Sequence, residues 1–356
     1  MSDPLPINVA DYESIAEAAC EPGYWGYVVG GAGDEVTLRE NVAAFRRRVL
    51  RPRMLVDVSD VSTRTTVLGS EIAMPLGIAP TSLQRVAHPE GEGALARAAS
   101  DAGTVYTLSS LASVRPRQLA EAAPDVLRWF QLYWSRDRGF TSELVSEAAD
   151  AGFTALVLTV DLPAAGPRER DLRSGFKLPP ELLMPNLPRT LTETEYFHDT
   201  LGEIVDTSLT WRDLEWLASE CSLPLVVKGV LTAEDAALAC EHGCAGVVVS
   251  NHGGRQLDGV SATLDALPEV ADTVAGRAEI YLDGGIRRGT DVAMALALGA
   301  RAVFVGRPAL WGLAAGGEAG AAHVLELFRA EIALALLLLG CPTPAEVGPE
   351  HVRLRA

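Results

Sequence analysis

The sequence predicts an α/β fold, a single (β/α)8 (TIM) barrel, and three observations support this class. From residue 74 onward, short apolar or β-branched runs alternate with alanine-rich segments of helical character. Eight such units follow one another, which fits a closed barrel better than an open sheet. The chain has 356 residues, of which 48% are hydrophobic, enough for a large buried core. We therefore assign residues 1–356 to one domain and keep an open doubly wound sheet as the alternative.

The predicted strands are apolar almost throughout, which is typical of a parallel sheet covered by helices. In chain order they are residues 75–80, 104–109, 128–134, 155–160, 224–229, 246–250, 280–284 and 302–306. The segments between them have helical character, and several end in glycine, which helix C-caps prefer. They include residues 89–103, 138–152, 232–243 and 288–299.

Further segments extend the predicted barrel at both ends. Residues 1–73 are expected to form a helical extension with two or three short helices over 8–46. The barrel itself is expected over 74–315, and C-terminal helices over 316–356. The most apolar stretch, 332–339, is far shorter than the ~20 residues that span a bilayer, so we predict a buried helix there.

One connection is much longer than the others. Residues 172–210 separate the fourth and fifth predicted strands and are rich in polar and acidic side chains. Long loops in compact domains are usually functional or disordered, and this one follows a strand at the face where barrel active sites form. An active-site lid and a disordered insertion are therefore equally good interpretations.

The charge and the cysteines exclude several classes of partner. A formal net charge of -17 disfavours nucleic acid and anionic membranes, so any anion site must be built locally from Arg, Lys and backbone N–H groups. No basic start followed by an apolar run marks a secretory signal. The cysteines show no metal-site spacing, which favours buried thiols in a reducing cytoplasm and no bound metal: Cys20, Cys221, Cys240, Cys244 and Cys341.

Polar side chains gather where the predicted strands end. The catalytic rim of a barrel lies at these carboxyl ends, and packing alone does not explain polar residues on five strands together. One such residue by itself would be interpreted as a side chain that forms a structural hydrogen bond. The residues are Gln131, Tyr133, Thr159, Asp161, Lys228, Ser250, Asn251, His252 and Asp283.

The last two units carry the pattern of a phosphate site. In LDGGIRRGTD (282–291), two glycines end a strand and Arg287 and Arg288 open a helix; VGRP (305–308) repeats this with Gly306 and Arg307. Backbone N–H groups at a helix N-terminus bind phosphate, and arginine adds a bidentate partner. Loops after strands seven and eight are the usual phosphate site of such barrels, so this interpretation is preferred over surface turns.

SNHGGRQLDG (250–259) is the most informative segment. His252 is the natural general base and Arg255 a planar clamp for a carboxylate, although an isolated histidine is more often structural. Asp161 would orient the imidazole, and Arg168 would add a second cation; both also fit a plain charged surface. Lys228 ends an apolar strand and would aim its charge at a ligand, with a satisfied rim residue as the alternative.

Together these segments resemble the FMN-dependent 2-hydroxy acid oxidase and dehydrogenase family, which includes glycolate oxidase, lactate oxidase, mandelate dehydrogenase and the flavin domain of flavocytochrome b2. The likeness covers about residues 8–350. SNHGGRQLD is highly specific, and further motifs follow in the family's order: APTSLQRVAHPEGE, FQLYW, LTVDLP, VVKGV, LDGGIRRGTDV and VGRP. The match at Tyr27, through YVVGGAGDE, is looser.

The resemblance implies a bound FMN and a role for each matching residue. Residues implied to contact the flavin are Pro80, Thr81, Ser82, Ser109, Gln131, Thr159, Lys228 and Ser250. Residues implied to hold the ribityl chain and phosphate are Asp283, Gly284, Gly285, Arg287, Gly306 and Arg307. The substrate carboxylate and hydroxyl would be bound by Tyr27, Tyr133, Arg168 and Arg255. His252 would take the proton, supported by Asp161 and Tyr133, either from the substrate hydroxyl with hydride transfer or from the α-carbon to give a carbanion.

The implied reaction is oxidation of an L-2-hydroxy acid to a 2-oxo acid. The glycolate-type pattern has Trp after the paired serines, whereas Leu111 follows them here, so we expect a larger aliphatic or aryl substrate such as a mandelate. No haem-binding segment is expected before the barrel, which argues against electron transfer to an attached haem, and residues 184–208 are polar, which argues against a membrane-bound dehydrogenase. We therefore expect a cytoplasmic oxidase that uses O2. The resemblance further implies a homo-oligomer, a tetramer.

Three alternatives remain open at this point. The first is a 2-hydroxy acid dehydrogenase that uses another electron acceptor. The second is a different FMN barrel enzyme, which would give no reason for His252 and Arg255 to stand together. The third is a flavin-binding protein without turnover, whose sequence should have lost one of these two residues.

Overall fold

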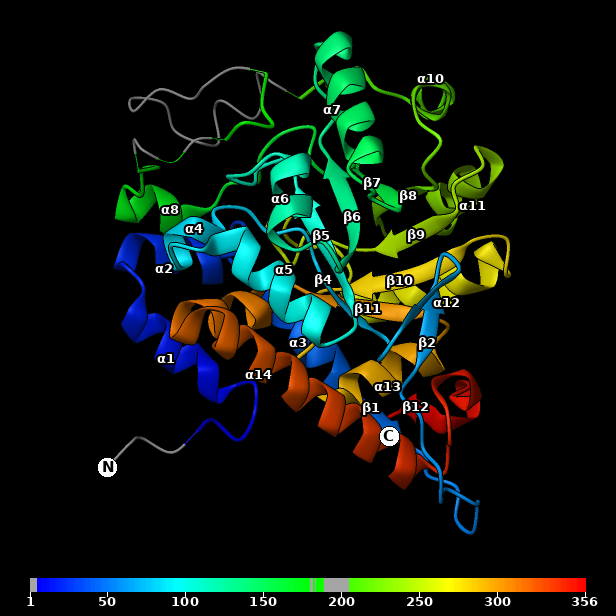
Figure 1. Cartoon of the computed structure of the whole chain (residues 1–356). Helices are drawn as coiled ribbons and strands as arrows, with labels where there is room; N and C mark the ends of the chain where they lie inside the picture. The colour runs from blue at the N-terminus through cyan, green and yellow to red at the C-terminus, as the bar shows by residue number, and fades with distance from the viewer. Residues whose placement is uncertain (1–4, 180–181, 183, 189–204) are drawn as a thin grey trace.

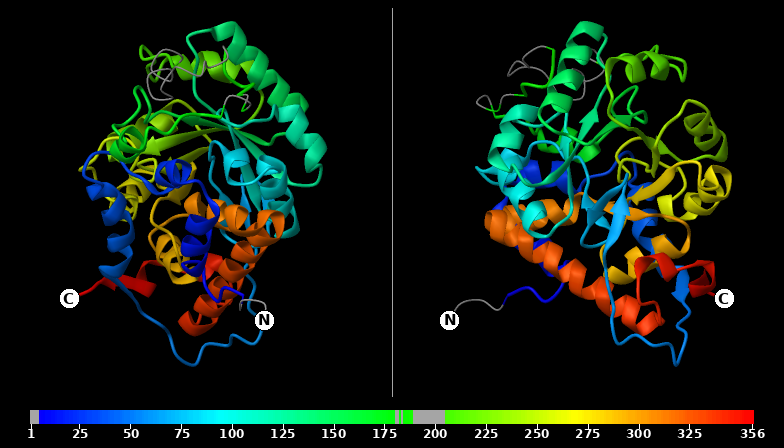
Figure 2. Two further views of the ribbon diagram at one scale, coloured as in Figure 1. Left: turned by 90° about the vertical axis from the view of Figure 1, so that its left-hand side faces the viewer. Right: turned by 45° about the vertical axis from the view of Figure 1, so that its right-hand side comes forward.

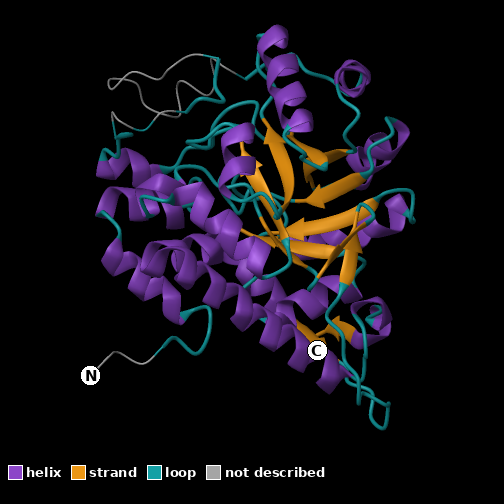
Figure 3. Ribbon diagram, in the orientation of Figure 1, coloured by secondary structure: helices purple, strands orange, loops and turns teal. Residues whose placement is uncertain are grey.

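The computed structural model describes residues 5–179, 182, 184–188 and 205–356. Its centre is a closed barrel of parallel strands with helices on the outside, so the predicted fold class is confirmed (Figure 3). The strands close in the order β10-β11-β4-β5-β6-β7-β8-β9. Their bounds are β4 Leu76–Ile78, β5 Val105–Ser109, β6 Leu127–Leu132, β7 Ala155–Thr159, β8 Leu225–Val230, β9 Gly246–Val249, β10 Glu279–Asp283 and β11 Ala302–Val305.

Helices follow each barrel strand and form the outer layer (Figure 1). All four helical segments named from the sequence are present, each within a few residues of its predicted bounds. The layer consists of α4 Gln84–Ala87, α5 Gly91–Asp101, α6 Pro116–Ala122, α7 Arg138–Asp150, α8 Glu169–Ser174, α10 Asp213–Glu220, α11 Ala233–Glu241, α12 Thr263–Val274, α13 Gly289–Ala297 and α14 Arg307–Leu339.

Side chains from all sides fill the barrel interior, as in other barrels of this class. Trp129, Tyr281 and Phe304 pack against one another there, with ring centroids 5.3 to 5.7 Å apart. A hairpin of β2 (Thr65–Val67) and β3 (Ser70–Ile72) adds Val67 and Ile72 to the same cluster. Buried side chains therefore fill the interior, and the strand ends are left as the place for a ligand.

The N-terminal extension contains both helices and strands, which differs from the all-helical segment expected for 1–73. Three helices, α1 (Asp11–Ala19), α2 (Pro22–Val29) and α3 (Val36–Arg46), agree with the two or three expected over 8–46. The hairpin and β1 (Arg48–Leu50) are additional, and β1 pairs antiparallel with β12 (Val352–Leu354) at the chain's other end. Isolated three-residue strands give too little periodicity to be recognised in a sequence.

The C-terminal part is dominated by α14, which runs beside α1 along one side of the molecule (Figure 2). Its helical geometry breaks at Gly316 and Gly317, and two short 3-10 helices, Pro344–Glu346 and Pro349–His351, follow it. The prediction that 332–339 is a buried helix is wrong in part. Its buried face includes Ile332, Leu336 and Leu339, but Leu334, Leu337 and Leu338 are 55%, 41% and 61% exposed.

The long connection after β7 lies only partly within the described residues. Its described portions are α8 and the neighbouring residues up to 179, then 182, 184–188 and 205–210. Met184 and Leu187 are buried in a second apolar cluster that also contains Tyr27, Leu111 and Leu310. The predicted lid over 172–210 otherwise falls outside the described residues. No helix in the described parts of the chain is both long and apolar enough to cross a membrane.

Candidate active site

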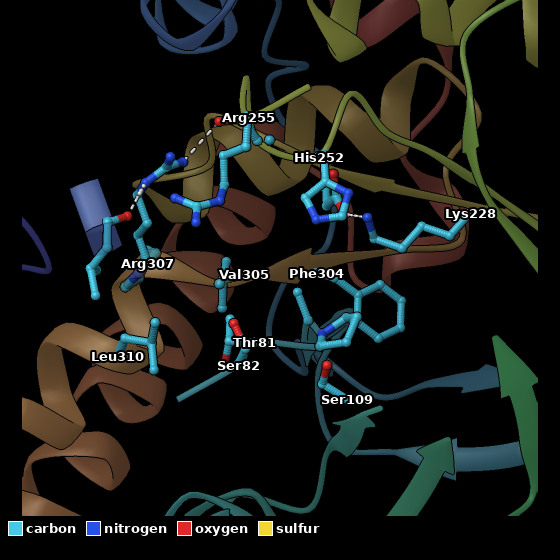
Figure 4. A pocket seen from close by; sticks show the side chains of 18 of the residues that line it. Thr81, Ser82, Ser109, Lys228, His252, Arg255, Phe304, Val305, Arg307 and Leu310 are labelled. Carbon is cyan, nitrogen blue, oxygen red and sulfur yellow. Dashed lines mark hydrogen bonds and ion pairs between the residues drawn. The ribbon is translucent and has the colours of Figure 1, made fainter. Parts of the chain in front are cut away.

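A cavity opens at the carboxyl ends of the barrel strands, with about 960 Å³ of space not filled by atoms, part of which is open to solvent. Its walls come from the ends of β4, β5, β8, β10 and β11, the loops after β6, β7 and β9, and the end of α2. Figure 4 shows His252, Arg255 and Lys228 facing Thr81, Ser82 and Ser109 across it.

His252 is held in a conformation that prepares it to accept a proton. Its Nδ1 lies 2.9 Å from Asp161 Oδ1, and its Nε2 lies 3.4 Å from the Tyr133 hydroxyl. Burial of Asp161 favours the neutral acid, but His252 and Lys228 outweigh burial and lower the pKa of Asp161. The ionised carboxylate can only accept, so the imidazole hydrogen sits on Nδ1 and the lone pair of Nε2 faces the cavity.

The charge of His252 is controlled by its surroundings. Burial lowers the pKa of the imidazole below its ordinary value of 6.5, Lys228 lowers it further, and Asp161 opposes both. The net direction is downward, so the ring is neutral at neutral pH. A neutral imidazole beside a carboxylate is the form that a general base needs before reaction.

The backbone of SNHGGR explains how the histidine reaches the cavity. His252 has a φ of 58°, a left-handed conformation uncommon outside glycine, and Gly253 and Gly254 continue it at 64° and 76°. A Cβ on Gly254 would lie 2.6 Å from backbone atoms of Leu38, so only glycine fits there. Sequence alone shows the two glycines but not the helix α3 against which Gly254 packs.

Two arginines point into the cavity near the histidine. Arg168 is only 3% exposed, and its Nε and Nη1 have no hydrogen-bond partner among the described residues. Burial lowers the pKa of Arg168 to about 10, and the charge of Arg255 adds to the shift. Arg255 donates from Nη1 to the carbonyl oxygen of Tyr27 at 2.6 Å and lies over the Tyr27 ring. A buried guanidinium with free donors fits a carboxylate ligand.

Tyr27, the loosest of the sequence matches, stands at this same place. Its hydroxyl lies 2.5 Å from Ser82 Oγ, and its ring lies beneath both Arg168 and Arg255 at 5.7 and 4.7 Å from their guanidinium carbons. The structure thus brings together the aromatic ring and the two guanidinium groups that the sequence only placed far apart along the chain.

Lys228 and its partners form the polar floor of the cavity. Lys228 Nζ lies 3.3 Å from Asp283 Oδ2 and 3.0 Å from Ser250 Oγ, and the lysine is 5% exposed. Burial opposes its charge, but Asp283 and Asp161 outweigh burial and raise the pKa of Lys228. The amino group therefore stays protonated. Asp283 Oδ1 is buried without a hydrogen-bond partner in the described part of the chain, which leaves an acceptor for a ligand hydroxyl.

The far end of the cavity has the character of a phosphate site. Gly284, Gly285 and Gly306 line it, and a Cβ on Gly285 would lie 2.1 Å from the Asn41 carbonyl oxygen. Arg307 donates to the carbonyl oxygens of Val28, Gly253 and Gly30, as the dashed lines in Figure 4 mark for two of them.

Nearby carboxylates offset the charge of these phosphate-site arginines only in part: Glu13 and Asp291 act on Arg287, and Glu35 acts on Arg307, yet burial lowers the pKa of both arginines. Arg287 lies over the Trp311 ring, and its guanidinium carbon is 4.8 Å from the ring centroid. Burial lowers the pKa of Arg307 well below its ordinary value, and the charges of Arg255, Arg287 and Arg168 lower it further. Buried cations that repel one another require an anion, and a phosphate monoester supplies one.

Four of the predicted site residues do not line the cavity but stand directly behind it. Gln131 accepts from Ser109 Oγ at 3.1 Å and donates to Thr159 Oγ1 at 3.0 Å. Ser250 contacts Lys228, and Asp161 contacts His252, as described above. The other predicted residues line the cavity: Tyr27, Pro80, Thr81, Ser82, Ser109, Leu111, Tyr133, Arg168, Lys228, His252, Arg255, Asp283, Gly284, Gly285, Arg287, Gly306 and Arg307.

Several residues of the site were not found from the sequence. Asn41 is one of them, and it exchanges two side-chain hydrogen bonds of 2.8 Å with Asn251, which the sequence did place at a strand end. Gln256 is another, and it donates to the carbonyl oxygens of Asp161 and Ala164. The apolar wall was also missed, because single leucines carry no local signal. Its members include Val28, Leu162, Phe304 and Leu310.

Comparisons with known proteins agree with the geometry. A family model described as "FMN-dependent dehydrogenase" matches residues 16–354. The chain is 49% identical over 360 residues to an "L-lactate oxidase" of Nostoc sp., covering 98% of each chain. It is 48% identical over 351 residues to a "Glycolate oxidase" of Spinacia oleracea, covering 97% of this chain and 95% of that one. It is similar to a solved structure of "Mandelate oxidase" with a TM-score of 0.91, 41% identity and 98% coverage of both chains.

Proposed function

The chain belongs to the FMN-dependent dehydrogenase family, and from this premise we propose that it oxidises an L-2-hydroxy acid to the 2-oxo acid with oxygen as acceptor. Relatives named lactate, glycolate and mandelate oxidase support this reaction class. One observation of the site supports it most directly. A neutral histidine backed by a carboxylate faces the same cavity as the buried Arg168 and the partly buried Arg255, and this cavity ends in a phosphate-type loop.

The residues present fit FMN as the cofactor. Asp283 Oδ1 is an unused buried acceptor for a ribityl hydroxyl, and the loops of Gly285 and Gly306 with Arg287 and Arg307 form a place for the phosphate. Lys228 would keep a positive charge near the flavin ring. Bound there, FMN supplies a two-electron acceptor for the substrate carbon and a donor for oxygen.

The chain's own residues bind and orient the substrate. Arg168 and Arg255 hold its carboxylate, which removes rotational freedom and presents the α-carbon to the cofactor side of the cavity. The hydroxyl of Tyr133 lies near His252 Nε2, where it can donate to the substrate oxygen. Burial raises the pKa of Tyr133, so its hydroxyl keeps the proton that it donates.

Proton removal is the task of His252. Its Nε2 lone pair takes a proton from the substrate, and the imidazolium that forms is stabilised by Asp161 through Nδ1. This assignment holds whether the proton leaves the hydroxyl or the α-carbon. Asp161 is 12% exposed in its side chain, and Gln256 fixes its backbone, so the carboxylate is set before reaction.

The apolar wall supports a substrate larger than glycolate. Leu111 is 4% exposed and lines the cavity with Leu162 and Leu310. The apolar side chain of a longer aliphatic or an aryl 2-hydroxy acid would exclude water from this wall. Each Å² of apolar surface buried in this way would contribute about 25 cal/mol to the binding free energy. We propose such an acid as the preferred substrate, in a cytoplasmic homo-oligomer.

The central test is anaerobic bleaching of the flavin absorbance by a panel of L- and D-2-hydroxy acids, followed by admission of air. We expect bleaching by L-acids and recovery in air. The His252→Ala variant should keep its flavin but lose nearly all of the reduction, a fall of at least about 100-fold for loss of a general base. Unimpaired reduction in this variant would contradict the assignment of the base.

Leu111→Trp tests the substrate size. The indole ring fills part of the space beside the apolar wall. The ratio of kcat/KM for mandelate-like acids to kcat/KM for glycolate should therefore fall by about 10-fold or more, the scale of effect that a change of pocket size has on specificity. Leu162→Ala is the opposite change and should not reduce activity toward the larger acids. An unchanged ratio in Leu111→Trp would mean that this wall does not select the substrate.

A further inference from the structure

Two site arginines are anchored on the same short piece of backbone. The carbonyl oxygen of Gly30, just past the C-terminus of α2, accepts from Arg255 Nη1 at 3.1 Å and from Arg307 Nη2 at 2.8 Å. The carbonyl oxygens of Tyr27 and Val28 accept from the same two arginines at 2.6 and 2.9 Å. Cations at a helix C-terminus are favoured by its dipole. The position of this backbone therefore sets both the substrate-side and the phosphate-side arginine.

Glu35 holds the turn that follows this backbone. Its Oε1 accepts from the backbone N–H of Gly31 at 3.0 Å, and its two oxygens accept from Arg170 Nε and Nη2 at 2.7 and 2.8 Å. The Glu35 side chain is only 15% exposed, and its φ is 58°. A non-glycine residue in the left-handed region persists only where its surroundings hold it there.

Arg170 connects the turn held by Glu35 to helix α8. It lies in α8, two residues after Arg168, and its aliphatic stem packs on α2 and on the residue that follows it. A Cβ at Gly30 would come within 3.4 Å of Arg170 Cδ, and one at Gly26 within 3.9 Å of its Cβ. Gly33 N also donates to the carbonyl oxygen of Pro167 at 3.0 Å, beside Arg168.

This ion pair differs from an ordinary surface pair. Exposed pairs contribute little, because water and salt screen them. In the Glu35–Arg170 pair the arginine side chain is 51% exposed, but the pair is bidentate, its carboxylate is only 15% exposed, and the carboxylate accepts a third hydrogen bond from the backbone. Burial opposes ionisation of Glu35, but Arg170 and Gly31 outweigh it and lower the pKa of the carboxyl group.

We propose that Glu35 and Arg170 are positioning residues that set the separation of Arg168 and Arg255 and, through Gly30, the placement of Arg307. Neither residue lines the cavity. The effect on substrate rests on the proposed function, whereas the effect on FMN rests on the phosphate site alone. The pair thus couples the affinity for the substrate carboxylate to the affinity for the FMN phosphate.

The test compares the FMN-loaded wild type with Arg170→Met, Glu35→Gln and the double variant. Arg170→Met keeps an aliphatic side chain that can pack on α2, and Glu35→Gln keeps an acceptor for the N–H of Gly31. Each substitution therefore removes mainly the charge. Arg173→Met is the matched control, because Arg173 lies on the same helix and, among the described residues, forms an ion pair with Glu169 alone, in which the two side chains are 75% and 44% exposed. KM, kcat, the FMN dissociation constant and the midpoint of thermal unfolding are measured for each.

We expect KM for the hydroxy acid to rise about 10-fold in both single variants while kcat changes by less than about 3-fold, the signature of lost binding shared by ground and transition states. The FMN dissociation constant should rise about 3- to 10-fold, as for loss of one charge-assisted contact. The double variant should be no worse than the singles, because the two residues act as a unit. Arg173→Met should match the wild type.

Several results would overturn the proposal. One is a change confined to the midpoint of thermal unfolding, with KM and the FMN dissociation constant at wild-type values, since that describes a purely structural pair. Another is additive losses in the double variant, and a third is an equal loss in Arg173→Met. If no hydroxy acid reduces the wild type, the proposed function fails instead, and the FMN dissociation constants alone decide the role of the pair.

Discussion

At the scale of single residues, the site depends on one histidine whose pKa is adjusted by opposing neighbours. Burial and Lys228 lower the pKa of His252, and Asp161 counteracts them. Sequence motifs identified these three residues, because each stands at a strand end. They did not reveal the backbone strain at His252, with its φ of 58°, which is typical of residues held for function.

Asp161→Asn should change both the rate and its pH dependence. Activity falls on the acid side as His252 takes up a proton, and its lowered pKa places this limb below 6.5, the ordinary value. Removing the Asp161 carboxylate removes the interaction that raises this pKa, so the acid limb of kcat/KM should move to lower pH. The plateau should fall by about 100-fold or more, because the imidazolium loses its stabilising partner.

The pH profile of kcat/KM between about pH 4 and 8 checks this prediction, with flavin absorbance as the control for cofactor content. An acid limb that stays at its wild-type position would show that Asp161 does not act on the titrating group. An unchanged plateau would mean that it does not stabilise the protonated ring.

At the scale of elements, α3 acts as a support for two of the loops that form the site. Asn41 on α3 pairs with Asn251, and its carbonyl oxygen lies against Gly285 in the loop after β10. Asp258 accepts from the N–H groups of Val36 and Thr37 at the start of the helix, which fixes the segment after His252. The sequence showed a helix over these residues but not the face it turns to the barrel.

Gly285→Ala tests this support. Its φ is 85°, and the new Cβ would meet the Asn41 carbonyl oxygen at 2.1 Å. Gly276→Ala is the matched control, because its φ is 79° and no atom lies within 4 Å. The control should lose about 1 to 2 kcal/mol of stability from the left-handed backbone. Gly285→Ala should lose about 1 to 3 kcal/mol more from the clash, together with FMN affinity.

Urea unfolding and FMN titration of both variants measure these losses. Equal destabilisation of the two proteins would show that the contact between α3 and the loop relaxes at no cost. Normal FMN affinity in Gly285→Ala would separate the loop from the phosphate site.

At the scale of the whole molecule, an acidic chain concentrates cations in one cavity. The formal net charge is -17, yet Arg168, Arg255, Arg287 and Arg307 all line the same space. Their mutual repulsion and their burial oppose folding, as the lowered pKa of Arg307 shows. An anionic cofactor removes this cost, so folding stability and FMN binding are linked.

The protein loaded with FMN should therefore unfold at a higher temperature than the stripped protein. Saturation at 100 times the dissociation constant adds about 2.7 kcal/mol, which corresponds to a shift of roughly 4 °C for a chain of this size. Calorimetry of the two forms measures it, and riboflavin, which lacks the phosphate, is the control ligand. Equal midpoints with FMN and riboflavin would show that the arginines do not contact the phosphate.

Local patterns along the chain were sufficient to predict the barrel, the ends of its strands and most of the residues around the cavity. Parallel strands that are buried on both faces appear as continuous apolar runs, and their carboxyl ends converge by construction. A polar residue after such a run is thereby assigned to the common mouth, as happened for Lys228, His252 and Asp283.

The contacts between segments far apart in the chain were visible only in the tertiary structure. These include the pairing of β1 with β12, the packing of the β2–β3 hairpin against the cluster that fills the barrel, and the anchoring of Arg255 and Arg307 on the end of α2. The Glu35–Arg170 pair belongs with them, since its partners are 135 residues apart in the chain. Periodicity reports which face of an element is buried, but not which neighbour covers it, because that depends on side-chain geometry in three dimensions.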